Sequence, residues 1–360
     1  MTVERHLPWA CIIVSALSPR PATVGIIANP ASGRDIRRLT SRASVFPNAE
    51  KASMVVRAIA GLRAAGVDDV LIMPDSGGIC GPLFRMMGDA GASAAGAHPR
   101  FVDMPVRSEA GDTLRATELM IAAGASALIV LGGDGTHRAV AARSGLVPLL
   151  ALSTGTNNAF PEMREATIAG LAAGLVARGL VPPTAGVRQN KRLRVSCDGK
   201  EDIALVDACV TRHNYVGSRA VWDIAEVDEL FVTFAGADAI GLSSIAGLLE
   251  PVARAAPHGL HVRCAPFDET PHRVIAPIAP GLVSEIGIRD YAQFAPRRRH
   301  VLAARSGTIA LDGEREIEFG PDNRIDVELD PNGPLTIDVS ATLTYAATHR
   351  LLRHYIGGAA

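Results

Sequence analysis

The chain has 360 residues, of which 48% are hydrophobic and 20% are charged, and its formal net charge is -1. This length is more than one hydrophobic core organises comfortably, so we expect at least two domains. The balanced charge argues against a nucleic-acid-binding protein, and the lack of any apolar run of about 18 residues argues against a membrane span.

The cysteines are scattered along the chain and odd in number: Cys11, Cys80, Cys197, Cys209 and Cys264. None stands at the close-paired spacing of a zinc or redox site. Reduced thiols are typical of the cytosol, so we expect a cytoplasmic protein.

From Thr23 onward, short aliphatic runs alternate with longer segments of helical spacing, a pattern typical of βαβ units and a parallel sheet. We expect strands at residues 24–28, 70–73, 101–104, 127–131 and 149–152. We expect helices at residues 53–65, 113–123, 136–142 and 165–178. The glycine-rich segment 75–97 is harder to place, and we interpret it as a lid beside a site.

Beyond Pro182, Pro183 and Gly186 the pattern changes to the alternation of half-buried strands. We expect these strands at residues 191–196, 203–212, 230–234, 261–264, 308–311 and 315–319. We therefore expect an α/β domain over residues 1–183 and a β-rich domain over residues 184–340. Residues 341–360 are expected to contain a C-terminal helix that returns to the first domain.

The predicted strand 127–131 leads directly into Gly132-Gly133-Asp134-Gly135-Thr136. Glycines at the carboxyl end of a buried strand let the backbone approach a phosphate, and the following helix would direct free N–H groups at it. Asp134 would repel a polyphosphate unless it holds a cation, positions an attacking hydroxyl or accepts its proton. The run indicates phosphoryl transfer. A tight turn with Asp134 as a helix N-cap is the alternative.

Two further polar loops follow predicted strands at the same edge of the sheet, where ligands of such folds bind. The first is Asn29-Pro30-Ala31-Ser32-Gly33-Arg34, which offers a hydroxyl, a bare backbone and a guanidinium suited to phosphate oxygens. The second is Thr154-Gly155-Thr156-Asn157-Asn158, whose hydroxyls and amides suit ribose or a sugar-like acceptor. Helix capping by Ser32 and turn formation by Asn and Gly are the alternatives.

A fourth run, Leu311-Asp312-Gly313-Glu314, lies between two predicted strands. Asp-Gly at such a position is an ordinary hairpin signal. Alone, it predicts only a turn.

In their order and spacing, NPASG, GGDGT, GTNNAF and LDGE resemble the superfamily of NAD kinases and diacylglycerol or sphingosine-type lipid kinases. The likeness runs from Val24 to about Phe319. Residues 149–170 are further similar to the acetoin catabolism protein X subfamily. The resemblance implies a Rossmann-like N-terminal nucleotide-binding domain and a β-sandwich-like C-terminal acceptor-binding domain, with ATP and acceptor in the cleft between them.

The resemblance also implies roles for the residues of these motifs. By similarity to NAD kinases the catalytic base would be Asp134, and by similarity to lipid kinases it would be Glu314 with help from Asp312. Either Asp134 or Glu314 would instead hold Mg²⁺, which prefers oxygen ligands. We expect nucleotide and phosphate contacts from Asn29, Ser32, Gly33, Arg34, Gly132, Gly133, Gly135, Thr136, Thr154, Gly155, Thr156, Asn157 and Asn158.

The sequence departs from both kinds of kinase where the acceptor would bind. NAD kinases carry an Asn and an acidic residue on a strand of the second domain; Asp207 supplies the acid here, but Val206 replaces the amide. The threonine- and serine-rich run of NAD kinases is also missing from residues 231–248. Lipid kinases have Asn-Glu one residue beyond GGDGT, where this chain continues His137-Arg138-Ala139.

We therefore expect an ATP-dependent phosphotransferase that moves the γ-phosphate to a hydroxyl of a nucleotide or a small polar acceptor, which Asp207 would help to bind. One alternative is a catalytically silent nucleotide-binding or regulatory protein of the same fold, and a further one is a lipid kinase. The resemblance implies a homo-oligomer. We expect no nucleic-acid partner and no membrane span.

Overall fold

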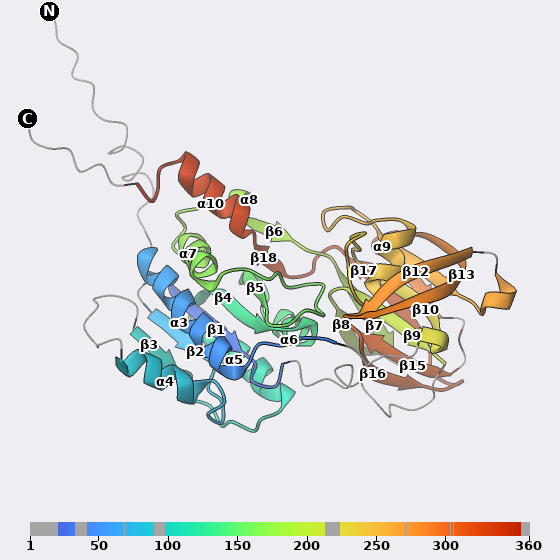
Figure 1. Ribbon diagram of the computed structural model, residues 1–360, viewed down its shortest axis with the longest axis horizontal. Coiled ribbons are helices and arrows are strands. Elements are labelled where there is room, and N and C mark those ends of the chain that lie inside the picture. The colour runs from blue at the N-terminus through green and yellow to red at the C-terminus, as the bar shows by residue number, and fades with distance from the viewer. Residues whose placement is uncertain are drawn as a thin grey trace, which may run out of the picture.

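The computed structural model describes residues 21–32, 42–67, 69–89, 98–212, 224–270, 272–302, 304 and 306–353 (Figure 1). The N-terminal half is built on a mostly parallel sheet with helices around it, and the C-terminal half consists mainly of strands. This mixed α/β architecture with a strand-rich second half agrees with the predicted fold class. The division near residue 183 stays a prediction.

Aliphatic side chains form the parallel sheet of the first half. Its strand order is β3-β2-β1-β4-β5-β18-β6, and only β6 runs antiparallel to its neighbour. The strands are β1 (Thr23–Ala28), β2 (Asp69–Ile72), β3 (His98–Phe101), β4 (Ala125–Gly132), β5 (Leu149–Ser153), β6 (Val187–Gln189) and β18 (Leu335–Ile337). The prediction was wrong for β3, which lies three residues earlier, because His98 to Arg100 pair with β2 despite their polarity.

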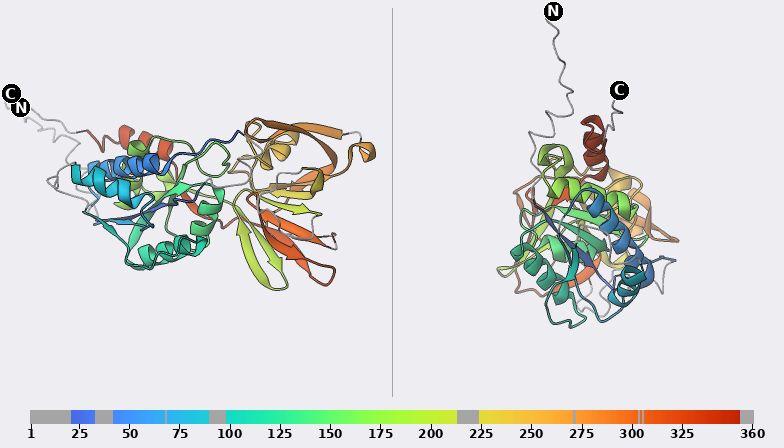
Figure 2. Two further views of the ribbon diagram at one scale, coloured as in Figure 1. Left: turned by 60° about the horizontal axis from the view of Figure 1, so that its bottom comes forward. Right: turned by 90° about the vertical axis from the view of Figure 1, so that its left-hand side faces the viewer.

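Helices cover both faces of this sheet (Figure 2). They are α3 (Asn48–Ala64), α4 (Cys80–Asp89), α5 (Ala110–Ala122), α6 (Asp134–Ala141) and α7 (Ala166–Ala177). Val24 and Ile26 pack toward α3 and α7, whereas Ile27, the next residue, packs toward α5 and α6. This alternation is that of a strand buried on both faces. The two helices α3 and α7 approach so closely that a Cβ on Gly170 would lie 2.1 Å from the Ala58 carbonyl oxygen.

The interpretation of residues 75–97 as a lid is not supported by their described part. Residues 80–89 form the helix α4, and Leu83 is buried in the core shared by β1, β2 and α3. The Asp75 carboxylate stabilises the start of this helix, because it accepts the backbone N–H groups of Ile79 and Cys80 at 2.6 and 3.0 Å.

Two antiparallel sheets form the second half. One has the order β12-β13-β11-β10-β9-β15-β16 and the other the order β14-β17-β7-β8. Their strands are β7 (Arg192–Cys197), β8 (Lys200–Ala204), β9 (Asp207–Thr211), β10 (Val227–Val232), β11 (Gly259–Cys264), β12 (His272–Ala279), β13 (Leu282–Phe294), β14 (Arg299–Val301), β15 (Gly307–Leu311), β16 (Glu314–Phe319) and β17 (Ile325–Asp330). Buried side chains of both sheets, such as Phe231 and Val327, share one core, so the sheets pack face to face.

Short helices complete the second half and the chain returns to the first sheet. The helix α9 (Ser243–Leu249) packs on the outer face of the larger sheet. The 3₁₀ turns η1 (Ile224–Glu226) and η2 (Phe267–Glu269) contact strand β13 of that sheet. After β17, the chain adds β18 to the parallel sheet. The helices α8 (Pro183–Gly186) and α10 (Val339–Thr348) then pack together, and α10 also contacts α7.

One predicted strand proved to be two. Residues 203–212 were expected to be continuous, but β8 ends at Ala204 and β9 begins at Asp207. The interruption at Leu205 and Val206 exists because the Asp312 side chain binds their backbone N–H groups. The apolar sequence gives no sign of this break.

Two absences concern only the described residues. The described cysteines, Cys80, Cys197, Cys209 and Cys264, are all free thiols, and Cys11 lies outside the described residues. Among the helices in the described ranges, none has both the length and the apolar composition needed to cross a bilayer.

Candidate phosphate-binding site

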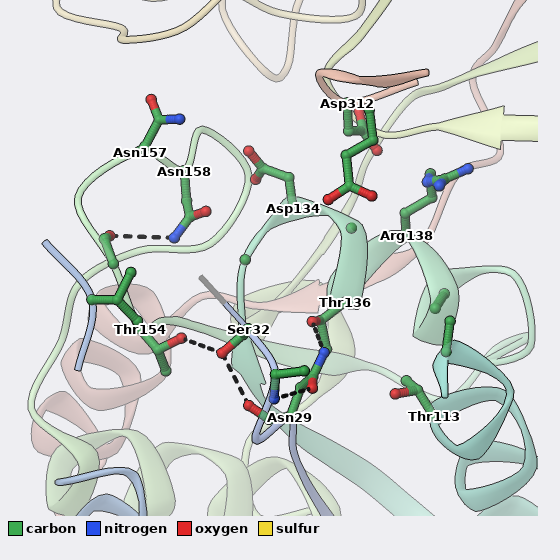
Figure 3. Close-up of a pocket in the computed structure, with 18 of the residues that line it drawn as sticks. Asn29, Ser32, Thr113, Asp134, Thr136, Arg138, Thr154, Asn157, Asn158 and Asp312 are labelled. Atoms are coloured by element: carbon green, nitrogen blue, oxygen red, sulfur yellow. Dashed lines mark hydrogen bonds between the residues drawn. The ribbon is translucent and has the colours of Figure 1, made fainter. Parts of the chain in front are cut away.

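A cavity of about 690 Å³ opens at the carboxyl edge of the parallel sheet (Figure 3). Small-molecule sites typically have volumes of roughly 300–1,000 Å³. The strand register creates the site, because Ala28 lies beside Leu131 and Gly132 beside Ser153, so that the loops after β1, β4 and β5 begin side by side. The polar side chains lining the cavity are Asn29, Ser32, Ser44, Thr113, Asp134, Thr136, Arg138, Arg143, Thr154, Thr156, Asn157, Asn158, Glu201, Asp202, Asp312 and Glu314.

Close contacts surround two glycines of the GGDGT run, Gly132 to Thr136, which we call the first motif. A Cβ on Gly132 would lie 2.6 Å from the Thr136 side chain, and one on Gly133 would lie 2.8 Å from Asn158 Oδ1. Real Cβ atoms do not tolerate such distances, so larger residues would displace the loop. Gly133, Gly135 and Thr136 line the cavity, whereas Gly132 does not.

Asp134 is the first residue of α6, and it connects the GGDGT run to the GTNNAF run, residues 155–160, which we call the third motif. Its carboxylate accepts the backbone N–H of Phe160 at 2.8 Å and that of Ala159 at 3.0 Å. The alternative reading as an N-cap is not supported, because Gly133 is the cap residue and no side chain caps this helix. The negative charge is nevertheless favourable there, at the positive end of the helix dipole.

Hydrogen bonds join the NPAS loop to both other motifs (Figure 3). Asn29 donates from Nδ2 to Thr136 Oγ1 at 3.0 Å and accepts the Ala31 N–H on Oδ1 at 2.9 Å. The Ser32 hydroxyl donates to the Asn29 carbonyl and lies 3.1 Å from Thr154 Oγ1. The predicted contacts Gly33 and Arg34 lie outside the described residues.

Hydrogen bonds within the third motif and to Ser153 and Ser44 hold this loop in place. Asn158 donates from Nδ2 to Ser153 Oγ at 2.7 Å and to the Gly155 carbonyl at 3.2 Å. Thr156 exchanges hydrogen bonds with the backbone of Ser44, in the segment that precedes α3. Asn158 therefore shapes the loop, while Asn157 extends from it toward the space above Asp134 (Figure 3).

The fourth motif reaches the cavity from the second half of the chain. Asp312 and Gly313 have φ angles of +52° and +80°, as the two-residue turn of the β15–β16 hairpin requires. This turn places Glu314 over the first motif, with its carboxylate 3.5 Å from the position of a Cβ on Gly135. The predicted hairpin turn is therefore present, and it brings Glu314 into the cavity that Asp134 also lines.

Asp312 has a mainly structural environment. Asp312 is 6% exposed, and its carboxylate accepts the backbone N–H groups of Leu205, Val206 and Asp207 at distances from 2.7 to 3.3 Å. Burial raises the pKa of Asp312 to about 7, and the nearby Arg138 charge opposes that rise. Asp312 thus fixes the hairpin turn that positions Glu314.

Asp207 is not brought into this cavity. It is 5% exposed, its carbonyl accepts the Asp312 N–H, and it is absent from the cavity lining. Val206 is 1% exposed and packs in an apolar cluster with Phe160 and Leu205. No described residue between 231 and 248 lines the cavity either. Acceptor binding by Asp207 stays a prediction.

Residues 24–180 match the family model of the ATP-NAD kinase N-terminal domain, and residues 191–332 match that of the acetoin catabolism protein X C-terminal domain. Acetoin catabolism protein X of Cupriavidus necator is 46% identical over 340 residues, which cover 92% of this chain and 94% of that protein. The chain belongs to the acetoin catabolism protein X family.

Solved structures place the family in a known fold. The crystal structure of yeast NADH kinase complexed with NADH superposes with a TM-score of 0.53 at 14% identity, covering 95% of this chain and 91% of that one. An NAD kinase from Archaeoglobus fulgidus in complex with ATP gives a TM-score of 0.36 at 11% identity over 92% of this chain and 100% of that chain. The predicted NAD kinase-like fold is confirmed by the first of these.

Two cations that sequence reasoning missed, the buried Lys51 and the half-buried Arg254, hold the loops of this family member in place. Lys51 on α3 is 1% exposed and donates from Nζ to the carbonyls of Asn29 and Ser32 at 3.0 and 3.3 Å. A buried charge requires such partners. Lys51 precedes the predicted helix 53–65, and the available signal was its helical spacing from the apolar residues Val55, Ala58 and Leu62.

Arg254, between α9 and β11, is the second missed cation. Its guanidinium donates to the carbonyls of Ala159 and Phe160 at 2.8 and 2.6 Å and lies 4.1 Å from the ring centre of Phe234. Asp134 binds the N–H groups of the same two residues. Arg254, in the second half of the chain, therefore holds the Ala159–Phe160 segment, and this segment in turn holds the Asp134 carboxylate.

The residues following GGDGT point in different directions. The His137 ring is buried, and its nitrogens lie 2.8 Å from the Gly133 carbonyl and 3.3 Å from the Val130 carbonyl. Burial lowers the pKa of His137 to about 4, so it is neutral at pH 7. Arg138 instead lines the cavity and pairs with Asp202 of β8 at 3.3 Å.

Proposed function

We propose that this protein is an ATP-dependent phosphotransferase that transfers the γ-phosphate to a hydroxyl of a small polar acceptor. The observation that carries the proposal is that Asp134, the first residue of α6, and Glu314, whose carboxylate lies beside Gly135, line the same cavity at the N-terminus of α6. A helix N-terminus with exposed N–H groups binds phosphate, and the facing carboxylates supply what transfer from it needs.

The donor nucleotide is assigned to the parallel-sheet side of the cavity. The backbone N–H groups of Gly133 and Gly135 lie at the start of α6, where the helix dipole attracts phosphates, while the Thr136 N–H donates to the Gly133 carbonyl. Arg138 and Arg143 line the same cavity and supply positive charge. The match of residues 24–180 to the ATP-NAD kinase N-terminal domain supports a nucleotide donor.

The cavity carboxylates suit Mg²⁺. Mg²⁺ is usually bound by one or two carboxylates together with substrate phosphates, and no larger cluster of ligand atoms is needed. Asp134 uses its oxygens to accept two backbone N–H groups, which fixes their direction, and a carboxylate has further lone pairs to offer. We therefore assign cation binding to Asp134, and the cation would neutralise charge on the transferred phosphate.

We assign the role of general base to Glu314. It is partly exposed at the cavity, whereas Asp312 is sequestered by backbone N–H groups and Asp134 is held by the third loop. The hairpin turn fixes Glu314 on the side of the cavity opposite the parallel sheet. An acceptor hydroxyl between Glu314 and the phosphate would lose its proton to this carboxylate.

The charges of the cavity favour an uncharged or cationic acceptor. Five acidic side chains line it, against two arginines, Arg138 and Arg143, which are already paired with Asp202 and Glu118. A dinucleotide acceptor would add phosphate charges to this surface, and Val206 offers it no amide. Val45 and Leu114 are the largest apolar residues of the described lining, which gives a lipid chain little to contact.

The test is phosphate transfer from ATP and Mg²⁺ to NAD and to a panel of uncharged polyols, by wild type and Asp134→Asn. We expect the variant to lose about 10²–10³-fold in kcat and to need more Mg²⁺, because it lacks the charge that binds the cation. Asp268→Asn, on the exposed turn η2, is the matched control and should behave as wild type.

Two results would overturn the proposal. Full activity in Asp134→Asn would remove this residue from the mechanism. Tight ATP binding without transfer to any acceptor would instead identify a nucleotide-binding protein that has kept the fold and lost turnover.

A further inference from the structure

A second group of chemically reactive side chains lies away from the cavity, at one rim of the two packed β-sheets. It consists of Glu229 on β10, His261 on β11 and His300 on β14. One ligand atom from each residue lies within 4.8 Å of the others. His261 Nε2 is 2.7 Å and His300 Nε2 is 3.5 Å from Glu229 Oε2. None of the three lines the phosphate-binding cavity.

The two sheets bring these side chains together. Glu229 and Phe231 share one face of β10 because they are two residues apart, and His261 is the register partner of Phe231 on β11. His300 comes from β14, in the opposing sheet. The group therefore bridges the two sheets.

Aromatic packing holds both imidazoles in place. The His261 ring stacks on Phe231 with a centroid distance of 4.2 Å and an interplanar angle of 2°. The His300 ring lies 5.1 Å from Phe231 and 4.5 Å from His261. Rings restrained in this way present their Nε2 atoms to Glu229 without needing to be ordered by a ligand.

We propose that Glu229, His261 and His300 bind a divalent transition-metal ion of the zinc type. Two imidazole nitrogens and one carboxylate oxygen are a known ligand set for zinc, with a fourth position left to water. Bonds of about 2.0–2.2 Å in tetrahedral geometry separate ligand atoms by roughly 3.3–3.6 Å. The distance of 3.5 Å from His300 meets this directly, and the 2.7 Å contact of His261 must open by under about 1 Å.

Burial and local charge are compatible with the ion. The Glu229 side chain is 7% exposed and that of His300 is 36% exposed, so the carboxylate is shielded while one ligand faces solvent and gives access. The nearby Arg263 is paired with Asp290 through two hydrogen bonds, at 2.8 and 2.5 Å, so its charge is compensated. The ion would replace the proton that now joins His261 to Glu229.

The alternative is that the Glu229–His261 hydrogen bond exists for packing alone. In that case His300 contributes only its ring surface, and no metal binds. The two readings differ in the role of His300, whose partial exposure also makes its replacement compatible with folding.

The test uses the tag-free full-length protein after treatment with a chelator. Zn²⁺ is titrated in competition with a chromogenic chelator, and Co²⁺ is added separately to record its absorption spectrum. We expect one equivalent to bind with micromolar or tighter affinity, with cobalt bands of tetrahedral nitrogen and oxygen ligation and no thiolate charge-transfer band. We also expect Zn²⁺ to raise the melting temperature, because the ion links two sheets of the folded state.

Three variants and a control decide the outcome. His300→Ala, His261→Ala and Glu229→Gln should each weaken binding by about 100-fold or more and abolish the thermal shift, since each removes a ligand. His272→Ala, an exposed histidine on β12, should leave both unchanged. No binding by wild type, or equal binding and thermal shift in His300→Ala, would overturn the proposal.

Discussion

The two ends of the cavity differ in how much of the kinase pattern they keep. At the sheet end, the first three motifs are intact and joined by hydrogen bonds between Asn29 and Thr136, Ser32 and Thr154, and Asp134 and the third loop. In the second half of the chain, Val206 is buried in an apolar cluster and Asp207 is absent from the cavity lining. We infer that the side proposed to bind the phosphate donor keeps the kinase pattern, whereas the side proposed to bind the acceptor departs from it.

This difference shows which part of the fold carries which function. Phosphate binding depends on backbone N–H groups at a helix N-terminus, and these require glycines and a fixed strand register. Acceptor recognition depends on side chains, which change without disturbing the sheet. We infer that the family retains the chemistry of the fold with a different acceptor.

The prediction with the largest effect concerns Glu314, the side chain of the second half that we propose as the general base. Glu314→Gln should lower kcat by about 10²–10⁴-fold, as expected for loss of a general base, and leave the Mg²⁺ requirement unchanged. Steady-state rates at varied Mg²⁺ measure both effects. Glu318→Gln, exposed on the same strand β16, is the control. A raised Mg²⁺ requirement in Glu314→Gln would assign it to the cation and contradict the roles given to the two ends.

A second prediction tests whether the two ends are physically connected. Arg254→Ala removes two hydrogen bonds to the Ala159–Phe160 segment and the contact with Phe234, so we expect a loss of about 2–4 kcal/mol in the free energy of unfolding and weaker ATP binding. Arg273→Ala is the matched control, because Arg273 also stacks on a phenylalanine ring, at 5.0 Å, but is exposed.

Denaturant unfolding and nucleotide titration measure these effects. The control should change stability by less than about 1 kcal/mol. If Arg254→Ala were as stable as this control and bound ATP normally, the second half would not position the donor site.

Sequence reasoning succeeded where local chemistry determines the structure. The aliphatic runs of β1, β4 and β5 and the Asp312-Gly313 turn follow from burial and backbone preference. It failed where distant segments determine the outcome. Neither the capture of the Asp134 carboxylate by the third loop nor the break between β8 and β9 has a local signal.

The smallest predicted effect concerns Asp312, which joins the segment between β8 and β9 to the hairpin. Its folded-state pKa of about 7 lies above the ordinary value of 3.8, so the folded protein binds more protons than the unfolded chain between these pH values. The stabilising contribution is complete below about pH 4 and is lost as the pH rises through about 7. Asp312→Asn should flatten this decline in denaturant unfolding measured across the range.

Asp312→Asn should also lower the free energy of unfolding by about 1–3 kcal/mol, because an amide has one acceptor oxygen where Asp312 accepts N–H groups on both of its oxygens. A pH dependence identical to wild type would show that Asp312 does not titrate in this range.

We expect the donor end of the cavity to work as in a kinase and the acceptor end not to select NAD. The most direct measurement compares initial rates of phosphate transfer from ATP to NAD and to uncharged polyols, in wild-type protein with Mg²⁺. We predict transfer to an uncharged acceptor with a kcat/KM well above that for NAD. NAD as the best acceptor in the panel would contradict the account, because the acceptor end would then be functionally unchanged.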